Sequence, residues 1–235
     1  MAVYVMVHGA WHGAWCWQRV RRLLVQAGHE VFTPCLTGVG ERAHLLSNQV
    51  RLATHVQDVV ADIEMNELQD VILVGHSYGG MVITGVADRL GSRLRHLVYV
   101  DAVVPLSGES WSSRHTRDTQ AARRQQITAC GGAMPAMDPS PLGLSADDEA
   151  WVRRRLTAHP GSVYDDPLVF DEAAWQSLPR TFIDCTAPAL PTVAIMRQRV
   201  RQNGGWRVHE LPTGHDPMIS APEAFTELLL AVACP

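Results

Sequence analysis

Six short runs rich in β-branched and apolar residues alternate along this chain with longer stretches of helical periodicity. The expected strands cover residues 3–7, 30–33, 71–74, 97–100, 180–185 and 207–211. Helices are expected over residues 17–27, 54–66, 78–90, 192–202 and 222–232. Strands joined by helical crossovers form a mostly parallel sheet with helices on its faces. The sequence therefore predicts an α/β fold with about six parallel strands.

Length and composition favour a globular protein. The 235 residues, 46% hydrophobic and 19% charged, suit one α/β core. The longest apolar runs fall short of the roughly 18 residues that a membrane span requires. Residues 2–7 enter a strand without a basic leader or a cleavage site. We therefore expect a water-soluble protein without a membrane partner.

The charged and sulfur-containing residues exclude several functions. All 20 basic residues are arginine, so lysine Schiff-base chemistry is ruled out. The net charge of −4 and the dispersed arginines argue against a nucleic-acid partner. The cysteines are scattered and show no C-x-x-C spacing, at Cys16, Cys35, Cys130, Cys185 and Cys234. We therefore expect neither a disulfide framework nor a metal or cofactor, and a cytoplasmic location.

Residues 105–178 interrupt the alternation. This segment is rich in Pro, Gly, Ser and Arg and has weaker periodicity. It is too long for a loop without secondary structure, so an insertion with its own short helices is expected. We predict a cap that closes over the strand ends, on a core formed by residues 1–104 and 179–235.

Residues 75–80 read Gly-His-Ser-Tyr-Gly-Gly between an expected strand and an expected helix. The pattern G-x-S-x-G is typical of a nucleophile elbow, a strained turn that only small residues can flank. A serine hydroxyl there needs a base to take its proton. Ser77 is the predicted nucleophile, and the side chain of His76 is expected to point away from the substrate.

The predicted base is His215. It lies in residues 211–217, between the last expected strand and the last helix, and therefore at the same carboxyl edge of the sheet as Ser77. Attack on a carbonyl also requires donors for the developing oxyanion. The backbone amides of Ala10, after the first strand, and of Tyr78 are the predicted donors. Gly9 allows a close turn there, and His8 is expected to be a hydrogen-bonding strut.

Three motifs together resemble a known family. Residues 8–17 read H-G-A-W-H-G-x-W-x-W, residues 75–80 read G-H-S-Y-G-G, and residues 214–217 read G-H-D-P. They look like the α/β-hydrolases that include plant methyl esterases, hydroxynitrile lyases and EstC-type carboxylesterases. The resemblance covers nearly the whole chain outside the cap and implies an α/β-hydrolase fold with a catalytic triad.

The chain departs from that family at the triad acid. In much of the family the acid follows the penultimate strand, but no carboxylate follows Cys185 here. Asp101, at the end of the strand after the nucleophile helix, is the preferred replacement, as in haloalkane dehalogenases and some lipases. Asp184 is the rival, within the strand. A dyad without an acid, or a nonfunctional site, is the remaining alternative.

The predicted reaction is hydrolysis of a small to medium, apolar or aromatic carboxylic ester through an acyl-enzyme. Trp11, Trp111, Met134 and Met137 are expected to line the substrate pocket. The alternatives are a ligand-binding protein, or a cyclase- or lyase-like enzyme on the same fold. A hydroxynitrile lyase is disfavoured by the resemblance itself, because in that group a threonine occupies the place of Gly9 and a lysine occupies the place of Asp216. The sequence leaves open whether the subunits form a homo-oligomer.

Overall fold

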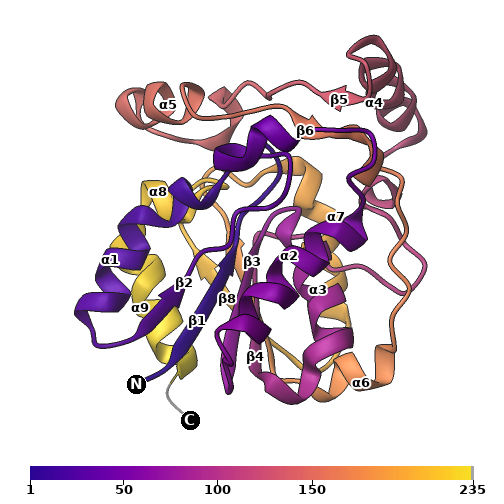
Figure 1. The fold of residues 1–235 in the computed structure, drawn as a ribbon. Coiled ribbons are helices and arrows are strands. Elements are labelled where there is room, and N and C mark those ends of the chain that lie inside the picture. The colour runs from indigo at the N-terminus through magenta and orange to yellow at the C-terminus, as the bar shows by residue number, and fades with distance from the viewer. Residues whose placement is uncertain (234–235) are drawn as a thin grey trace.

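A computed structural model describes residues 1–233 of the chain, so Cys234 lies outside the described residues. A six-stranded sheet runs through the centre in the order β2-β1-β3-β4-β7-β8, with every neighbouring pair parallel (Figure 1). Its strands are β1 (Val3–Val7), β2 (Glu30–Phe32), β3 (Val71–His76), β4 (Leu94–Val100), β7 (Arg180–Cys185) and β8 (Trp206–Leu211). The predicted parallel sheet of about six strands is confirmed.

Alternating side chains of the strands divide the core into two layers. Tyr4 and Met6 of β1 belong to the apolar cluster beneath α1 (Gln18–Gln26) and α9 (Pro222–Ala233). Val5 and Val7 belong to the other cluster, beneath α2 (Leu52–Met65), α3 (Gly79–Leu90) and α7 (Ala194–Gln202). Because successive side chains of a strand point to opposite faces, helices cover both faces of the sheet.

Two strands are longer than the sequence pattern indicated. β3 continues through Gly75 and His76, which pair with Tyr99 and Val100 of β4. β4 begins at Leu94 rather than at residue 97. The side chains of these additional residues show no strong strand pattern. They are nevertheless part of the strands because neighbouring parallel strands supply their hydrogen-bond partners.

The segment between β4 and β7 forms further elements. They are α4 (Arg117–Ala129), β5 (Ala133–Met134), α5 (Ala146–Arg153), β6 (His159–Pro160) and α6 (Glu172–Ser177). The first four lie over the carboxyl ends of the sheet strands, and β5 pairs antiparallel with β6 (Figure 1). By contrast α6 lies beside α3, because Trp175 is buried there and its indole N–H donates to the Tyr99 hydroxyl at 2.9 Å.

The chain between β8 and α9 contains the short helix α8 (Pro217–Ser220). The remaining helical turns are of the 3-10 type, at Ala14–Trp17, Gly40–Leu45, Gly91–Arg93, Trp111–Arg114, Ser140–Leu142, Gly161–Val163 and Pro191–Val193. Within residues 1–233, none of the helices combines the length and the apolar character that crossing a membrane would require.

Candidate active site

Ser77 occupies a sharp turn between β3 and α3. Its φ of +52° lies in the left-handed region, which is costly for a residue with a side chain. The turn is held by hydrogen bonds from the Ser77 amide to the Val100 carbonyl (3.1 Å) and from the Val103 amide to the Ser77 carbonyl (2.9 Å). The strained backbone therefore presents the serine at the carboxyl end of the sheet, as the elbow motif predicted.

The glycines that flank this turn have no room for a side chain. A Cβ atom on Gly75 would lie 2.7 Å from the Gly79 carbonyl oxygen, and one on Gly79 would lie 2.7 Å from the Val7 carbonyl oxygen. Strand β3, helix α3 and strand β1 therefore pack closely only because these positions are glycine. This contact explains the spacing of the G-x-S-x-G motif.

Asp101 lies against the ring of His215. The His215 Nδ1–H donates to Asp101 Oδ2 at 2.7 Å, and both side chains are buried. Asp101 directly follows β4, and its amide is fixed by the Ile183 carbonyl at 2.8 Å. A carboxylate in this position fixes the imidazole tautomer that leaves Nε2 free to accept a proton.

The second Asp101 oxygen binds an arginine. Arg197 Nη2 donates to Asp101 Oδ1 at 2.6 Å, while its Nε donates to Asp184 Oδ1. Arg201 binds the other Asp184 oxygen at 2.6 Å. The described contacts of Asp184 are therefore with arginines, and the structure brings Asp101 to His215. Arg197 compensates the buried charge of both carboxylates, which would otherwise be costly.

The loop after β1 approaches the nucleophile. A Cβ atom on Gly9 would lie 2.9 Å from Ser77 Cβ and 2.8 Å from His76 Nδ1, so only glycine fits. Ala10 lines the cavity above Ser77. The Tyr78 amide follows Ser77 at the start of α3, and the Tyr78 hydroxyl contacts His55 Nδ1 at 3.0 Å. The backbone amides of Ala10 and Tyr78 as donors to the oxyanion remain a prediction.

His8 is a strut, as expected. Its Nε2 accepts from the Leu36 amide at 3.1 Å, and its Nδ1–H donates to the Gly9 carbonyl at 2.8 Å. Burial lowers the pKa of His8 to about 4, so the ring is neutral at physiological pH. The ring therefore anchors the loop that carries Ala10.

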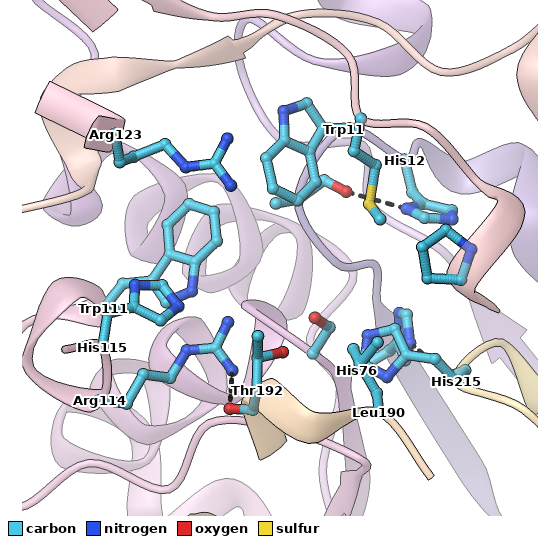
Figure 2. A pocket seen from close by; sticks show the side chains of 14 residues that line it. Trp11, His12, His76, Trp111, Arg114, His115, Arg123, Leu190, Thr192 and His215 are labelled. Carbon is cyan, nitrogen blue, oxygen red and sulfur yellow. Dashed lines mark hydrogen bonds between the residues drawn. The ribbon is translucent and has the colours of Figure 1, made fainter. Parts of the chain in front are cut away.

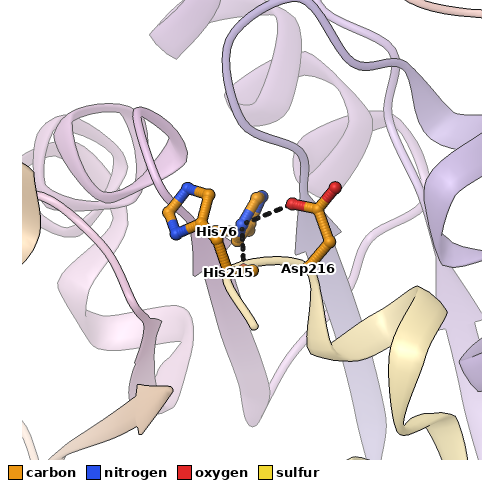
Figure 3. Close-up of side chains that lie close together, drawn as sticks. All are labelled: His76, His215 and Asp216. Atoms are coloured by element: carbon orange, nitrogen blue, oxygen red, sulfur yellow. Dashed lines mark hydrogen bonds and ion pairs between the residues drawn. The ribbon is translucent and has the colours of Figure 1, made fainter. Parts of the chain in front are cut away.

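A second carboxylate, that of Asp216, follows His215 directly in the chain. Asp216 is fully buried, and its Oδ2 is 3.0 Å from His12 Nε2, while its Oδ1 is 3.4 Å from His76 Nε2. His76 Nε2 also lies 2.9 Å from the carbonyl oxygen of His215 (Figure 3). The Nδ1 atom of His12 lies 2.9 Å from the Ala10 carbonyl. This network joins the loop that carries Ala10 to the loop that carries His215.

Electrostatic interactions in this network favour a protonated His12 and an ionised Asp216. Burial opposes protonation of His12, but the adjacent Asp216 carboxylate outweighs burial and raises the His12 pKa. Burial likewise opposes ionisation of Asp216, but His12 and His76 hold the pKa of its carboxyl well below the usual range. A protonated His12 donates from both ring nitrogens, to Ala10 and to Asp216.

Nitrogen and oxygen atoms of His76, His215 and Asp216 lie within 4.8 Å of one another, a spacing compatible with a metal ion (Figure 3). His215 already uses Nδ1 to bind Asp101, and His76 uses Nε2 to contact the His215 carbonyl. Hydrogen bonding therefore accounts for the grouping of these residues.

A cavity of about 270 Å³ opens above Ser77 (Figure 2). It is lined by Ala10, Trp11, His12, His76, Ser77, Trp111, Arg114, His115, Arg123, Met137, Pro141, Leu190, Thr192 and His215. Ser77 and His215 therefore face one space. The rings of Trp11 and Trp111 meet edge to face, with centroids 5.6 Å apart.

Two expectations about individual side chains differ from the structure. Met134 is fully buried in the core and is not among the residues that line the cavity, whereas Met137 is. Met134 lies in β5, which pairs with β6, and it belongs to the larger of the two apolar clusters of the core. His76 lines the cavity instead of pointing away, because its ring packs beside that of His215 at 4.6 Å between centroids.

Comparison with known proteins identifies the family to which this fold belongs. The alpha/beta hydrolase family matches residues 4–228, and the chain belongs to this family. It is 40% identical over 243 residues to a carbendazim hydrolyzing esterase of Nocardioides sp., covering 99% of this chain and 100% of that protein. It is 25% identical to methylesterase 2 of Arabidopsis thaliana, over 98% of this chain and 95% of that protein.

A solved structure shows the same architecture. An extracellular α/β-hydrolase from a Paenibacillus species superimposes with a TM-score of 0.87, at 24% identity and over 98% of each chain. That protein is described as sharing structural and functional homology with tobacco salicylic acid binding protein 2. The likeness therefore covers residues 105–178 as well as the sheet.

Proposed function

We propose that the protein is a serine esterase that cleaves a carboxylic ester through an acyl-enzyme. The observation that carries the proposal is the hydrogen bond of 2.7 Å between His215 and Asp101, beside a cavity that Ser77 also lines. The resemblance to the carbendazim hydrolyzing esterase and to a methylesterase supports ester hydrolysis.

The reaction would proceed in two stages. His215 Nε2 takes the Ser77 proton as Oγ attacks the ester carbonyl, and Asp101 stabilises the imidazolium that forms. The Ala10 and Tyr78 amides hold the oxyanion. His215 then protonates the departing alcohol, and water hydrolyses the acyl-enzyme by the same route.

The cavity points to a small or medium substrate. Its volume of about 270 Å³ is at the lower end for ligand sites, and indole rings form part of its wall. We propose that the insertion, residues 105–178, is the cap that selects the substrate, because it supplies Trp111 and Met137 to this cavity.

The test is hydrolysis of a panel of p-nitrophenyl and methyl esters by the protein and by Ser77→Ala. We expect kcat to fall by at least two orders of magnitude in the variant with thermal unfolding unchanged, since a smaller side chain at the elbow adds no strain. A fluorophosphonate should label Ser77 stoichiometrically. An unlabelled protein that still binds aromatic esters would instead indicate a ligand-binding protein.

A further inference from the structure

Two arginines of the cap segment line the cavity. Arg114 ends the 3-10 turn Trp111–Arg114, and Arg123 lies in α4. Figure 2 shows both guanidinium groups on the same side of the cavity, with Trp111 between them and both directed toward its interior. Ester hydrolysis by Ser77 and His215 makes no use of either charge.

The structure leaves these two charges uncompensated. Arg124, the next residue along α4, binds Asp165 at 2.8 Å. Arg114 and Arg123 instead donate to neutral oxygens, the Thr192 carbonyl at 3.0 Å and the Gln126 side chain at 2.9 Å. Within residues 1–233, neither arginine has a carboxylate within ion-pair distance, and neither Asp nor Glu lines the cavity.

Several hydrogen-bond donors of Arg114 and of the neighbouring indole rings also lack acceptors among the described residues. Arg114 Nε, Trp111 Nε1 and Trp11 Nε1 are buried and have no acceptor in the described part of the chain. A buried donor without an acceptor costs free energy, and a buried cation without a counter-charge costs more. An acceptor-rich anionic group in the cavity would remove both costs.

The described residues that line the cavity do not supply that negative charge. Burial lowers the pKa of Arg114 to about 10 although Tyr164 and the carboxylate of Asp101, which is not among its ion-pair partners, act in the opposite direction; Arg114 is therefore charged at neutral pH. Burial, together with Arg114 and Arg123, lowers the pKa of His115 to about 4, so this ring is neutral. The wall of the cavity therefore carries the positive charge of the two arginines.

The aromatic rings define what should accompany the anion. Arg114 Cζ lies 5.8 Å from the Trp111 ring centre, and Arg123 Cζ lies 5.5 Å from that of Trp11. A guanidinium binds a planar carboxylate through paired hydrogen bonds, and indole rings bind flat apolar groups. We propose that the substrate is the half-ester of a small aromatic dicarboxylic acid and that Arg114 and Arg123 bind its free carboxylate. This inference rests on the proposed esterase function.

The test compares two esters of matched shape, anionic monomethyl terephthalate and neutral methyl 4-methylbenzoate. We expect wild-type kcat/KM to be at least tenfold higher for the anionic ester. The anionic-to-neutral ratio should fall about ten- to hundredfold in Arg114→Gln and in Arg123→Gln, the usual effect of losing a hydrogen bond to a charged group. Arg124→Gln removes an equal charge from the same helix and should leave the ratio unchanged.

Binding to Ser77→Ala separates this inference from the proposed activity. Calorimetry should give tighter binding of monomethyl terephthalate than of the neutral ester, weakened at least tenfold when Arg114→Gln is added. Arginine-dependent binding without hydrolysis by the wild type would refute the esterase and retain the cationic site. Equal affinities and equal kcat/KM values for the two esters, or ratios insensitive to both glutamine variants, would overturn the inference. Arg114→Lys, which keeps the charge, should partly restore the ratio and guards against misfolding.

Discussion

Asp101 and Asp184 are side chains of the same type bound by the same arginine, yet only Asp101 contacts His215. Asp101 Oδ2 accepts from His215 Nδ1 at 2.7 Å, whereas Asp184 binds Arg197 and Arg201. Asp101→Asn should lower kcat by about four orders of magnitude, because the amide holds the wrong imidazole tautomer. Asp184→Asn should cost less than about tenfold in kcat, since it changes the charge around Arg197 and Arg201 but leaves the bond between Asp101 and His215 in place. Steady-state kinetics of both variants on one ester measure this ranking, and the reverse ranking would refute the assignment of Asp101.

The sequence allowed Ser77, His215 and Asp101 to be predicted because each follows a recognisable strand. The carboxyl ends of parallel strands meet at one edge of the sheet, so position in the chain implied proximity. Arg197 gave no such indication. Its partner Asp101 lies 96 residues away, and the side chain reaches it from α7, one arginine among several in that helix.

The loop after β1 and the loop after β8 are joined through His12 and Asp216. These residues lie 204 positions apart, and their pairing could not be inferred from either motif alone. Since a protonated His12 donates to the Ala10 carbonyl and to Asp216, it fixes the loop whose amide is predicted to bind the oxyanion. We therefore predict that Asp216 is a positioning residue, which acts through His12.

Asp216→Asn should consequently affect kcat more than KM. We expect kcat to fall about ten- to a hundredfold, as loss of part of the oxyanion stabilisation requires, with KM changed less than about threefold. His12→Gln, which can still bridge the two loops, should lose less activity. The measurement is kcat and KM for one p-nitrophenyl ester, with thermal unfolding as the control for folding. Parallel losses in stability and in activity toward all esters would indicate a merely structural role.

Residues 105–178, the proposed cap, contribute side chains to the wall of the cavity. Met137 lines the cavity from the segment between β5 and α5. Met137→Trp should fill part of its volume, and it should therefore lower kcat/KM for bulky aromatic esters at least tenfold while acetate esters change less than about threefold. Ratios of kcat/KM across an acyl series provide the test. An equal decrease for every ester would show that Met137 supports the fold and not substrate choice.

At the scale of the whole molecule, the sequence predicted the sheet better than the elements of residues 105–178, the proposed cap. Every sheet strand was found because β-branched residues concentrate in the central strands, whose two faces are both buried. The cap has short elements whose order depends on contacts with the core. Thus α6 lies beside α3 because Trp175 meets Tyr99, a contact 76 residues apart that no local pattern indicates.

Buried neutral histidines make the stability of the whole fold depend on pH. Burial lowers the pKa of His8 and of His55 to about 4, whereas the unfolded chain protonates each near pH 6.5. Below about pH 6.5 the unfolded state therefore binds more protons than the folded state, and the free energy of unfolding falls as the pH falls toward 4. At about pH 5 each of these histidines should cost about 2 kcal/mol. His12, with a raised pKa, opposes part of this loss, because its contribution is complete below about pH 6.5 and disappears as the pH rises through its folded value.

Urea unfolding at about pH 7.5 and about pH 5 should accordingly show a lower free energy of unfolding at the acidic pH. His55→Gln should reduce this difference, because it removes a titrating ring while an amide can still bond the Tyr78 hydroxyl or the Thr37 carbonyl. His44→Gln alters an exposed histidine and should leave the difference unchanged. Equal free energies of unfolding at the two pH values would show that the buried histidines do not determine stability at acidic pH. The same conclusion would follow if the difference between the two pH values were equal for the protein and for His55→Gln.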